Sequence, residues 1–212
     1  MKNSTRTLQC LSALAGLIAL TAGCSSGMTR EECEAIDWRG IGYEDGVAGR
    51  PQTAIAARRQ ACGRQGIAFD LDGYRDGWNT GVRQYCQSNN GYREGRNGHA
   101  YSAVCPQDLE PAFLDAYRDG RQLYDLQTEV SRLSHAIEYK RQRLAELQTA
   151  IVDTTVRLVS PAMTVDQRVT LVESLHRMQQ EHSAIQQELP ALQAQLDNAQ
   201  GQLAVVSAER RY

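Results

Sequence analysis

The 212-residue sequence predicts an all-α protein, with a small glycine- and tyrosine-rich, disulfide-bonded helical domain followed by a long antiparallel coiled-coil hairpin. Two observations predict this fold class. The stretch from Gly40 to Gly120 holds thirteen of the seventeen glycines and both phenylalanines. After Gly120 one glycine remains, cysteine, Trp and Phe are absent, and leucine recurs at helical spacing. We place the domain at 29–124 and the hairpin at 108–212, so that the first helix of the hairpin overlaps the end of the domain.

The N-terminal segment is typical of an exported lipoprotein precursor. Lys2 and Arg6 precede an apolar stretch at 8–21, which is too short to anchor stably across a bilayer. The residues LTAGC at 20–24 resemble the lipobox at which bacterial lipoproteins are lipidated and cleaved. We therefore predict lipidation of Cys24. The alternative is an ordinary secretory signal with a coincidental cysteine.

Lipidation of Cys24 would place the protein in the cell envelope. The lipoprotein signal peptide then comprises residues 1–23, and residues 24–28 form a lipidated tether. Two or more acyl chains, such as palmitate, attach a protein stably to a membrane, whereas a single chain attaches it marginally. Ser25 follows the cysteine, and by the same resemblance the absence of Asp there favours the outer membrane. We expect a lipid-anchored outer-membrane protein whose body faces the periplasm.

Export also determines how the cysteines are interpreted. Cys10 leaves with the signal peptide and Cys24 carries lipid, so four cysteines remain. In an oxidising compartment an even number predicts two disulfides, with three pairings open. We favour the pairing of nearest neighbours in sequence, Cys33–Cys62 and Cys86–Cys105. The competing interpretation is a metal site of Cys86, Cys105 and His99, which no Cys-x-x-Cys pair supports.

A degenerate five-residue repeat occurs four times in the glycine-rich region. The irregular spacing of the copies excludes a solenoid of equal units. The glycine, tyrosine and carboxylate positions of the copies are Gly42, Tyr43, Asp45 and Gly46; Gly73, Tyr74, Asp76 and Gly77; Gly91, Tyr92, Glu94 and Gly95; and Tyr117, Asp119 and Gly120. In the first three copies another glycine follows three or four residues later.

We predict that the repeat glycines lie on helices. Asp-Gly and Glu-Gly pairs also occur in β-hairpin turns, which are the alternative, but no alternating apolar strands flank them here. Small residues four, and seven or eight, positions apart line up on one helix face and let another backbone approach closely. Each interior glycine costs about 1 kcal/mol relative to alanine, so tight packing and the disulfides must offset that cost.

Capping and breaking residues divide the domain into short helices. Thr29 with Glu32 resembles a capping box. The other boundary signals are Arg50-Pro51, the stretch 63–66, Asp70 or Asp72 as a cap, a turn at Ser88-Asn89-Asn90, and 105–108 ahead of a helix with Pro111 in its first turn.

A heptad pattern predicts the first arm of the hairpin, because ten of eleven core positions are apolar or β-branched. These positions are Leu123, Leu126, Val130, Leu133, Ile137, Lys140, Leu144, Leu147, Ile151, Thr154 and Leu158. Ser160-Pro161 ends this arm, and Thr164 with Gln167 can cap the second.

The second arm has a similar core pattern, formed by Leu171, Leu175, Met178, His182, Ile185, Leu189, Leu192, Leu196, Ala199, Leu203 and Val206. The short connection makes the arms antiparallel if they pair within one chain. The alternatives are an open form that pairs with another copy, or a hairpin lying along the membrane or against the domain. We expect Lys140 and His182 to set register or partner choice rather than to perform chemistry. Pro190 should kink the arm or interrupt its hydrogen bonds.

An ordered string of residues between Trp38 and Tyr124 carries a family resemblance. Its members are Trp38, Gly42-Tyr43-x-Asp45-Gly46, Cys62, Tyr85-Cys86, Gly91-Tyr92, Gly95, Gly98, Tyr101, Cys105-Pro106, Phe113 and Tyr117-x-x-Gly120. The region resembles the uncharacterised proteobacterial lipoproteins that share domain of unknown function 2799. The resemblance leaves the coiled coil outside. It implies an envelope lipoprotein and confers no activity.

Three classes of function fit these features. The repeat carboxylates could serve a wall-modifying hydrolase, but capping and pairing with Arg75, Arg93 or Arg118 explain them as well. The tyrosines could stack on the sugar rings of peptidoglycan or another glycan, although packing around glycine faces explains them too. The third class is a structural or adaptor protein without catalytic activity.

We expect the third class. A net charge of −2 gives no electrostatic reason for nucleic-acid binding. The sequence has no nucleophile elbow, P-loop or dinucleotide-binding motif, so we predict no enzyme activity, cofactor or metal. The expected partners are the membrane, through lipid on Cys24, and a protein or peptidoglycan.

Overall fold

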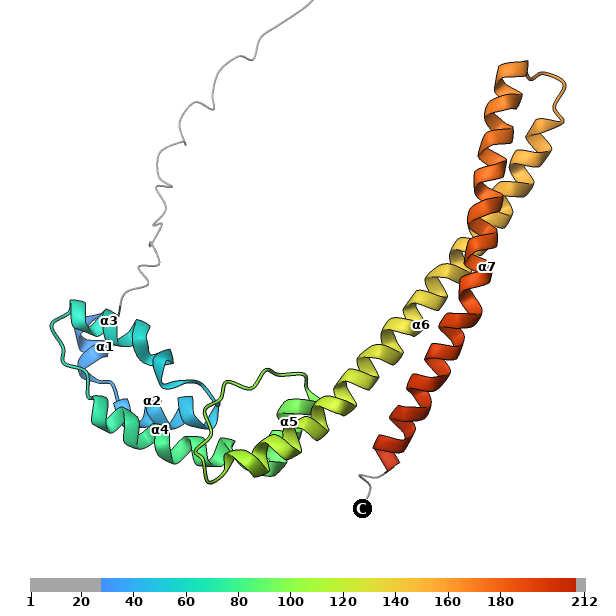
Figure 1. Cartoon of the computed structure of the whole chain (residues 1–212). Coiled ribbons are helices and arrows are strands. Elements are labelled where there is room, and N and C mark those ends of the chain that lie inside the picture. Colours follow the sequence, from blue (N-terminus) through green and yellow to red (C-terminus); the bar gives the residue numbers. More distant parts are fainter. Residues whose placement is uncertain (1–27, 209–212) are drawn as a thin grey trace, which may run out of the picture. The chain divides into compact units, whose positions relative to one another are not determined.

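The structure, a computed structural model, describes residues 28–208 and is helical without strands over that range (Figure 1). The predicted all-α fold class is confirmed. The elements are α1 (Arg30–Glu34), α2 (Trp38–Val47), the 3-10 helix η1 (Gln52–Ile55), α3 (Ala56–Arg64), α4 (Leu71–Tyr85), α5 (Ser88–Arg96), α6 (Glu110–Leu158) and α7 (Val165–Ala208). The predicted signal peptide and Cys24 lie outside the described residues. No helix within 28–208 is long and apolar enough to cross a membrane.

The described residues divide into two compact units. The first, residues 28–36 and 57–69, contains α1 and most of α3. Its centre is the disulfide between Cys33 and Cys62, whose residues are 2% and 0% exposed. With so few apolar side chains in this unit, the covalent link is the main restraint that holds its two helices together.

Side-chain capping explains the starts of several helices. Thr29 and Glu32 form the predicted capping box at α1, and Thr164 with Gln167 forms the same reciprocal pair ahead of α7. Asp70 accepts a hydrogen bond from the backbone N–H of Gly73 and caps α4. The predicted turn at 88–90 is wrong, because helix α5 begins at Ser88. The Asn90 side-chain amide donates to the carbonyl of Tyr85 and so ties α5 to the end of α4 across the short turn at 86–87.

The second unit, residues 37–56 and 70–208, is built from three helix pairs: α2 with α4, α5 with the start of α6, and α6 with α7. Helix α6 belongs to two of these pairs, so it joins the glycine-rich part of the unit to the hairpin without a break.

The hairpin forms within one chain, with α6 and α7 antiparallel and joined at 159–164 (Figure 1). All the predicted core positions of both arms are buried or half-buried. Leu133, Ile137, Leu196 and Ala199 form a buried cluster across the interface. Charged pairs at its edge fix the register.

Two of these edge interactions involve residues at or near the core. Half-buried Lys140, the one charged core position of α6, pairs with Glu188 at 2.5 Å. Arg143 donates two hydrogen bonds to Glu181, at 2.8 and 2.9 Å. Helix α7 continues through Pro190 to Ala208. The proline side chain is exposed, so its ring does not disturb the core.

Candidate functional site

The glycines of α2 and α4 bring the two backbones into direct contact. A Cβ atom on Gly42 would lie 2.0 Å from the carbonyl oxygen of Tyr74, and one on Gly77 would lie 1.9 Å from that of Arg39. Real Cβ atoms essentially never come within 3.0 Å of another atom. Only glycine fits these positions, and the prediction of glycine-faced helices over turns is confirmed.

The pair α5–α6 uses the same arrangement. Cβ atoms on Gly91 and Gly95 would lie 2.4 and 2.1 Å from the carbonyl oxygens of Phe113 and Tyr117. In return, a Cβ on Gly120 would lie 2.2 Å from the carbonyl oxygen of Tyr92. Such approach also allows Cα–H···O contacts between helices, which are individually weak.

Equivalent residues in the two pairs show that one structural unit occurs twice. The ring of Tyr85 lies against Gly49, which has φ +64°, and the ring of Tyr124 lies against Gly98, which has φ +75°. The two glycines are 49 positions apart and the two tyrosines 39 positions apart. Residues of α2 therefore correspond to residues of α5 that lie 49 positions later, and residues of α4 to residues of α6 that lie 39 positions later.

Polar contacts obey the same correspondence. Arg50 bonds Asp45 at 3.0 Å in the first pair, and His99 contacts Glu94 at 3.1 Å in the second. The carbonyl of Arg50 accepts from the indole of Trp78, while the carbonyl of His99 accepts from a tyrosine hydroxyl. The repeated unit is thus a pair of helices that closes on a glycine with positive φ.

This finding corrects the repeat that the sequence indicates. By contact, Gly120 corresponds to Gly81 rather than to Gly77, because each lies on the carbonyl of a first-helix tyrosine, Tyr92 and Tyr43. A Cβ on Gly73 would meet the capping carboxylate of Asp70, so that glycine serves the helix start rather than the interface. Sequence similarity over five residues equates Gly120 of the fourth copy with Gly77 of the second. The helix contacts equate it with Gly81, four residues further along α4.

The repeat carboxylates have structural partners. Asp45 is 2% exposed and accepts hydrogen bonds from Arg50 and from the Tyr74 hydroxyl. Exposed Asp76 pairs with Arg39 on the facing helix at 2.9 Å. The predicted partners Arg75, Arg93 and Arg118 are wrong for Asp45, Asp76 and Glu94, which pair with other residues, because adjacent residues on a helix point about 100° apart. Asp119 also has an interaction partner.

The tyrosines divide between core and surface. Tyr74 and Tyr85 are 1% and 6% exposed, so packing accounts for them. The ring of Tyr101 lies against that of Phe113, with ring centroids 5.1 Å apart and planes tilted by 39°. Tyr43 is 39% exposed.

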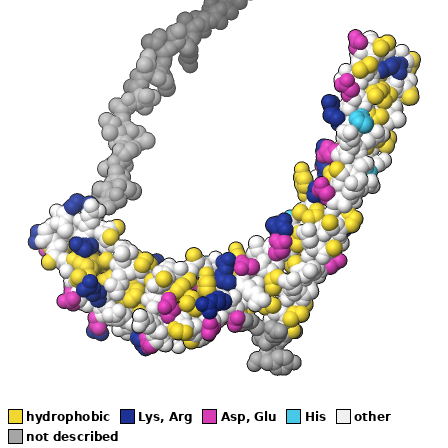
Figure 2. Space-filling model, viewed as in Figure 1, with side chains coloured by type: hydrophobic (Ala, Val, Ile, Leu, Met, Phe, Trp, Pro, Cys, Tyr) yellow, Lys and Arg dark blue, Asp and Glu magenta, His cyan; other side chains and the backbone are white. Residues whose placement is uncertain are grey.

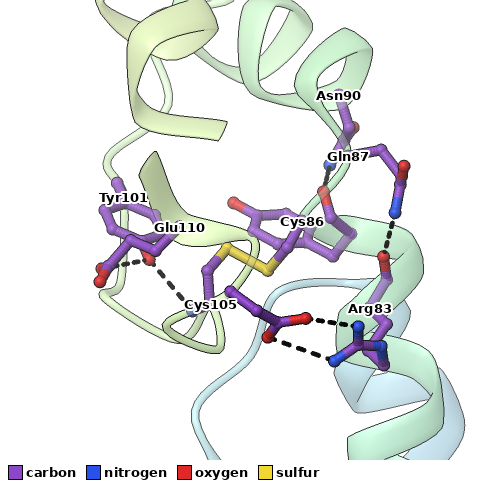
Figure 3. The surroundings of a disulfide bond; sticks show 9 residues. Arg83, Cys86, Gln87, Asn90, Tyr101, Cys105 and Glu110 are labelled. Carbon is purple, nitrogen blue, oxygen red and sulfur yellow. Dashed lines mark hydrogen bonds and ion pairs between the residues drawn. A yellow bond between two sulfur atoms is a disulfide. The ribbon is translucent and has the colours of Figure 1, made fainter. Parts of the chain in front are cut away.

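The two helix pairs meet at the second disulfide, Cys86–Cys105 (Figure 3). Cys86 ends α4, and Cys105 precedes α6. The backbone N–H of Cys105 donates to the hydroxyl of Tyr101, which donates in turn to Glu110. Both favoured disulfides are therefore present, and Cys86 and Cys105 are not free to bind metal with His99. Among the described residues, no group of three or more His, Cys, Asp or Glu could hold a metal ion.

A charged pair and two amides surround this junction. Arg83 forms a fork with both oxygens of Asp108, at 2.6 and 3.3 Å. This guanidinium holds the pKa of the Asp108 carboxyl below its usual range. Gln87 donates to the carbonyl of Arg83, and Asn90 to that of Tyr85 (Figure 3). Burial, with a smaller contribution from the charge of Glu94, raises the pKa of Tyr85 to about 12.

A pocket of about 510 Å³ opens at this junction. Its lining residues come from the end of α2, the end of α4 and the start of α5: Val47, Arg83, Gln84, Tyr85, Gln87, Asn89, Asn90 and Arg93. No carboxylate is among them. Arg93 donates to the side-chain oxygen of Asn90. We call this the junction pocket, and its donors suit a polar ligand that carries a carboxylate.

Sequence reasoning did not find the junction pocket. Its residues come from three segments that are linked only by tertiary packing, and the segment 88–90 was assigned to a turn. The available signal was the density of amide side chains from Gln84 to Asn90 beside two arginines.

Comparison with known proteins gives one family match. Residues 37–122 match the model of a family described as protein of unknown function (DUF2799), as the resemblance predicted. Neither the curated proteins nor the solved structures yield a match. The match covers both glycine-faced helix pairs and the Cys86–Cys105 disulfide, and it ends as α6 enters the hairpin.

Proposed function

We propose that this chain, whose residues 37–122 match DUF2799, is a lipid-anchored envelope protein that acts as a non-catalytic adaptor. The observation that carries the proposal is the hairpin. Its shorter arm, α7, has 44 residues and spans about 66 Å at 1.5 Å per residue. A rigid pair of helices of that length suits contact with a partner far from the site of attachment.

The anchor would act on the opposite end of the chain. The lipobox-like residues at 20–24 support lipidation of Cys24, and only four residues separate that cysteine from Thr29, the N-cap of α1. Four residues span at most about 14 Å when extended. The tether would hold α1 close to the membrane.

Replacing Cys24 tests the anchor. Cys24→Ala should leave an unacylated protein that no longer fractionates with membranes, and mass spectrometry of the wild type should show the acyl chains. Wild-type fractionation of the variant would disprove lipid attachment at this residue. Cys10→Ala is the matched control and should change neither property.

Shortening the hairpin tests the adaptor role. Deleting residues 130–143 and 186–199 removes two heptads from each arm and takes out the facing residues of the Leu133 cluster together. The variant should keep its helical circular dichroism and its membrane fractionation, because the seam stays in register. Photocrosslinks from residue Ala162 in the connecting loop to envelope partners should be lost. If they persist, the hairpin does not provide reach.

A second candidate function is binding of peptidoglycan, and the junction pocket favours it. Two guanidinium groups and four amide side chains line this pocket without a carboxylate, and the peptide stems of peptidoglycan carry free carboxylates. Pull-down of the full chain with isolated sacculi should weaken at least tenfold on Arg93→Gln. Arg96→Gln, on the same helix but outside the pocket, is the control. Equal retention of both variants and the wild type would exclude the pocket as the binding site.

A further inference from the structure

Several exposed valines lie near the end of the hairpin where α6 and α7 are joined. Figure 2 shows hydrophobic side chains on the surface at this end. The valines are Val152 at 54%, Val156 at 63% and Val159 at 77% exposed on α6, and Val165 at 76%, Val169 at 53% and Val172 at 54% exposed on α7. Monomeric proteins expose single apolar side chains routinely, but contiguous apolar patches mark interaction sites.

Five of the six valines lie on one side of the hairpin, and Val156 lies next to them on the back of α6. In the heptads that place the core at positions a and d, the α6 valines occupy b and f, and the α7 valines occupy e and b. In an antiparallel pair, the sides that carry b and e adjoin each other. Val159 and Val165 each lie three residues from Ala162, and Val152 and Val172 each lie ten, so the stripes also match in height. We call the combined surface the valine face.

The heptad positions that carry the valines hold no charged residue in these stretches of α6 and α7, whereas Asp166 and Glu173 of α7 occupy position f beside them. Between 142 and 159, every charged residue of α6 (Arg143, Glu146, Asp153 and Arg157) occupies position c or g, on the opposite side. The bidentate contact of Arg143 with Glu181 across the arms confirms that assignment. On α7 the b and e positions from 165 to 186 are likewise free of Asp, Glu, Lys and Arg.

Two threonine hydroxyls on this side of α6 already have hydrogen-bond partners. The hydroxyls of Thr149 and Thr155 donate to the carbonyls of Ala145 and Ile151 in their own helix, at 3.0 and 2.7 Å. Burying them would leave no unpaired hydroxyl, which is the usual penalty for covering a polar surface. Another apolar protein surface could therefore cover this face without leaving these hydroxyls unpaired.

We infer that the occupant is a second copy of this chain, packed face to face about a two-fold axis parallel to the hairpin. A two-fold interface must be complementary to itself. Here each stripe meets a stripe of the same residue type and the same 4-3 spacing, since α6 of one copy faces α7 of the other. The absence of charge at the valine positions limits like-charge repulsion between copies. A lipid surface fits less well, because the face lacks the Lys, Arg, Trp and Tyr of interfacial helices.

The size of the face sets the strength of the dimer. Six partly exposed valines offer on the order of a few hundred Å² per copy, which is at the low end of specific interfaces. The dimer should therefore dissociate in the micromolar range. This inference does not depend on lipid attachment or on the adaptor role, and it leaves the opposite side of the hairpin free.

Two experiments on the full chain test the inference. Sedimentation of the purified wild type should show a reversible monomer–dimer equilibrium below about 100 μM. The double variant Val156→Glu/Val169→Glu should raise the dissociation constant at least tenfold with unchanged helical circular dichroism, because both positions are exposed in the monomer. Asp153→Asn/Thr170→Glu, on the opposite side at similar heights, is the control and should dimerise like the wild type.

Cysteine crosslinking tests the orientation. Two differently tagged chains, one with Val156→Cys and the other with Val169→Cys, should form a mixed disulfide when co-expressed, whereas Asp153→Cys with Thr170→Cys should not. A wild type that remains monomeric at the highest concentration would overturn the inference. So would equal crosslinking from both sides, or valine-dependent binding to neutral lipid vesicles without any dimer.

Discussion

Gly77 offers the sharpest test of the backbone-to-backbone packing. It lies in the middle of α4, where a Cβ atom would stand 1.9 Å from the carbonyl oxygen of Arg39 and 2.9 Å from the backbone nitrogen of Tyr43. Both neighbours are backbone atoms of α2, so no side-chain rotation relieves the clash. The substitution Gly77→Ala requires the two helices to separate by roughly 1.5 Å before ordinary contact distances return, which also loosens the contacts of the other interface glycines.

Two opposing effects determine the magnitude. Alanine stabilises a helix interior by about 1 kcal/mol relative to glycine, whereas overpacking a well-packed interface costs about 1–3 kcal/mol or more. The rigid backbone at 1.9 Å places Gly77 at the upper end of that range. We expect the variant to lose about 2 kcal/mol of unfolding free energy. A Cβ atom on Gly201, in α7, would meet no heavy atom of another part of residues 28–208 within 4 Å, so Gly201→Ala should gain about 1 kcal/mol.

Urea denaturation measures both variants. Tryptophan fluorescence follows the α2–α4 pair, which contains Trp38 and Trp78, and circular dichroism at about 222 nm follows the helices of the hairpin. The essential result is that the unfolding free energy falls in Gly77→Ala and rises in Gly201→Ala. The same substitution is thereby compared at a position packed against another backbone and at an open position. A Gly77→Ala protein at least as stable as the wild type would refute the close approach of α2 and α4.

Three further predictions follow from the contacts. Replacing Cys86 and Cys105 together by serine should cost about 3 kcal/mol of unfolding free energy, as expected for a loop of this length, and mass mapping of the wild type without reductant should find neither thiol free. The raised pKa of Tyr85 means that its neutral form is favoured in the folded state. The free energy of unfolding should therefore fall as the pH rises from about 10 to about 12. In urea titrations at alkaline pH, Tyr85→Phe should reduce that fall. The pKa of Glu181 is lowered by its hydrogen bonds with Arg143. The stability of the hairpin should therefore decline as the pH falls below the ordinary glutamate value of 4.5. The decline, measured as the difference between the urea midpoints at neutral and acidic pH, should be smaller in Glu181→Gln.

The hairpin could be predicted almost completely from the sequence. Heptad periodicity is a local property, and once Ser160-Pro161 stops one helix and Thr164 caps the next, an antiparallel pair is the simplest way to bury both seams. The same holds for the capping box at Thr29 and the cap at Asp70, where donor and acceptor are three residues apart. Each of these features depends on residues that are neighbours in the chain.

The glycine-rich region shows where sequence reasoning stops. A glycine stripe predicts that some backbone approaches closely, but it does not name the partner helix. Aligning the motif copies by their letters placed Gly120 beside Gly77, whereas the contacts equate Gly120 with Gly81. The junction pocket was missed for the same reason, because Val47, Arg83 and Arg93 belong to three different helices.

The sequence by itself determined the class of fold, the two arms and their seam, the presence of disulfides and the need for glycine, since each follows from local spacing or composition. Only the tertiary structure decided which helices pair. The motif of Gly42 to Gly46 pairs with α4, and that of Gly91 to Gly95 with α6, because chain connectivity and the tyrosine rings against Gly49 and Gly98 admit that arrangement. A contact between backbones leaves no side-chain pattern from which its partner could be identified in advance.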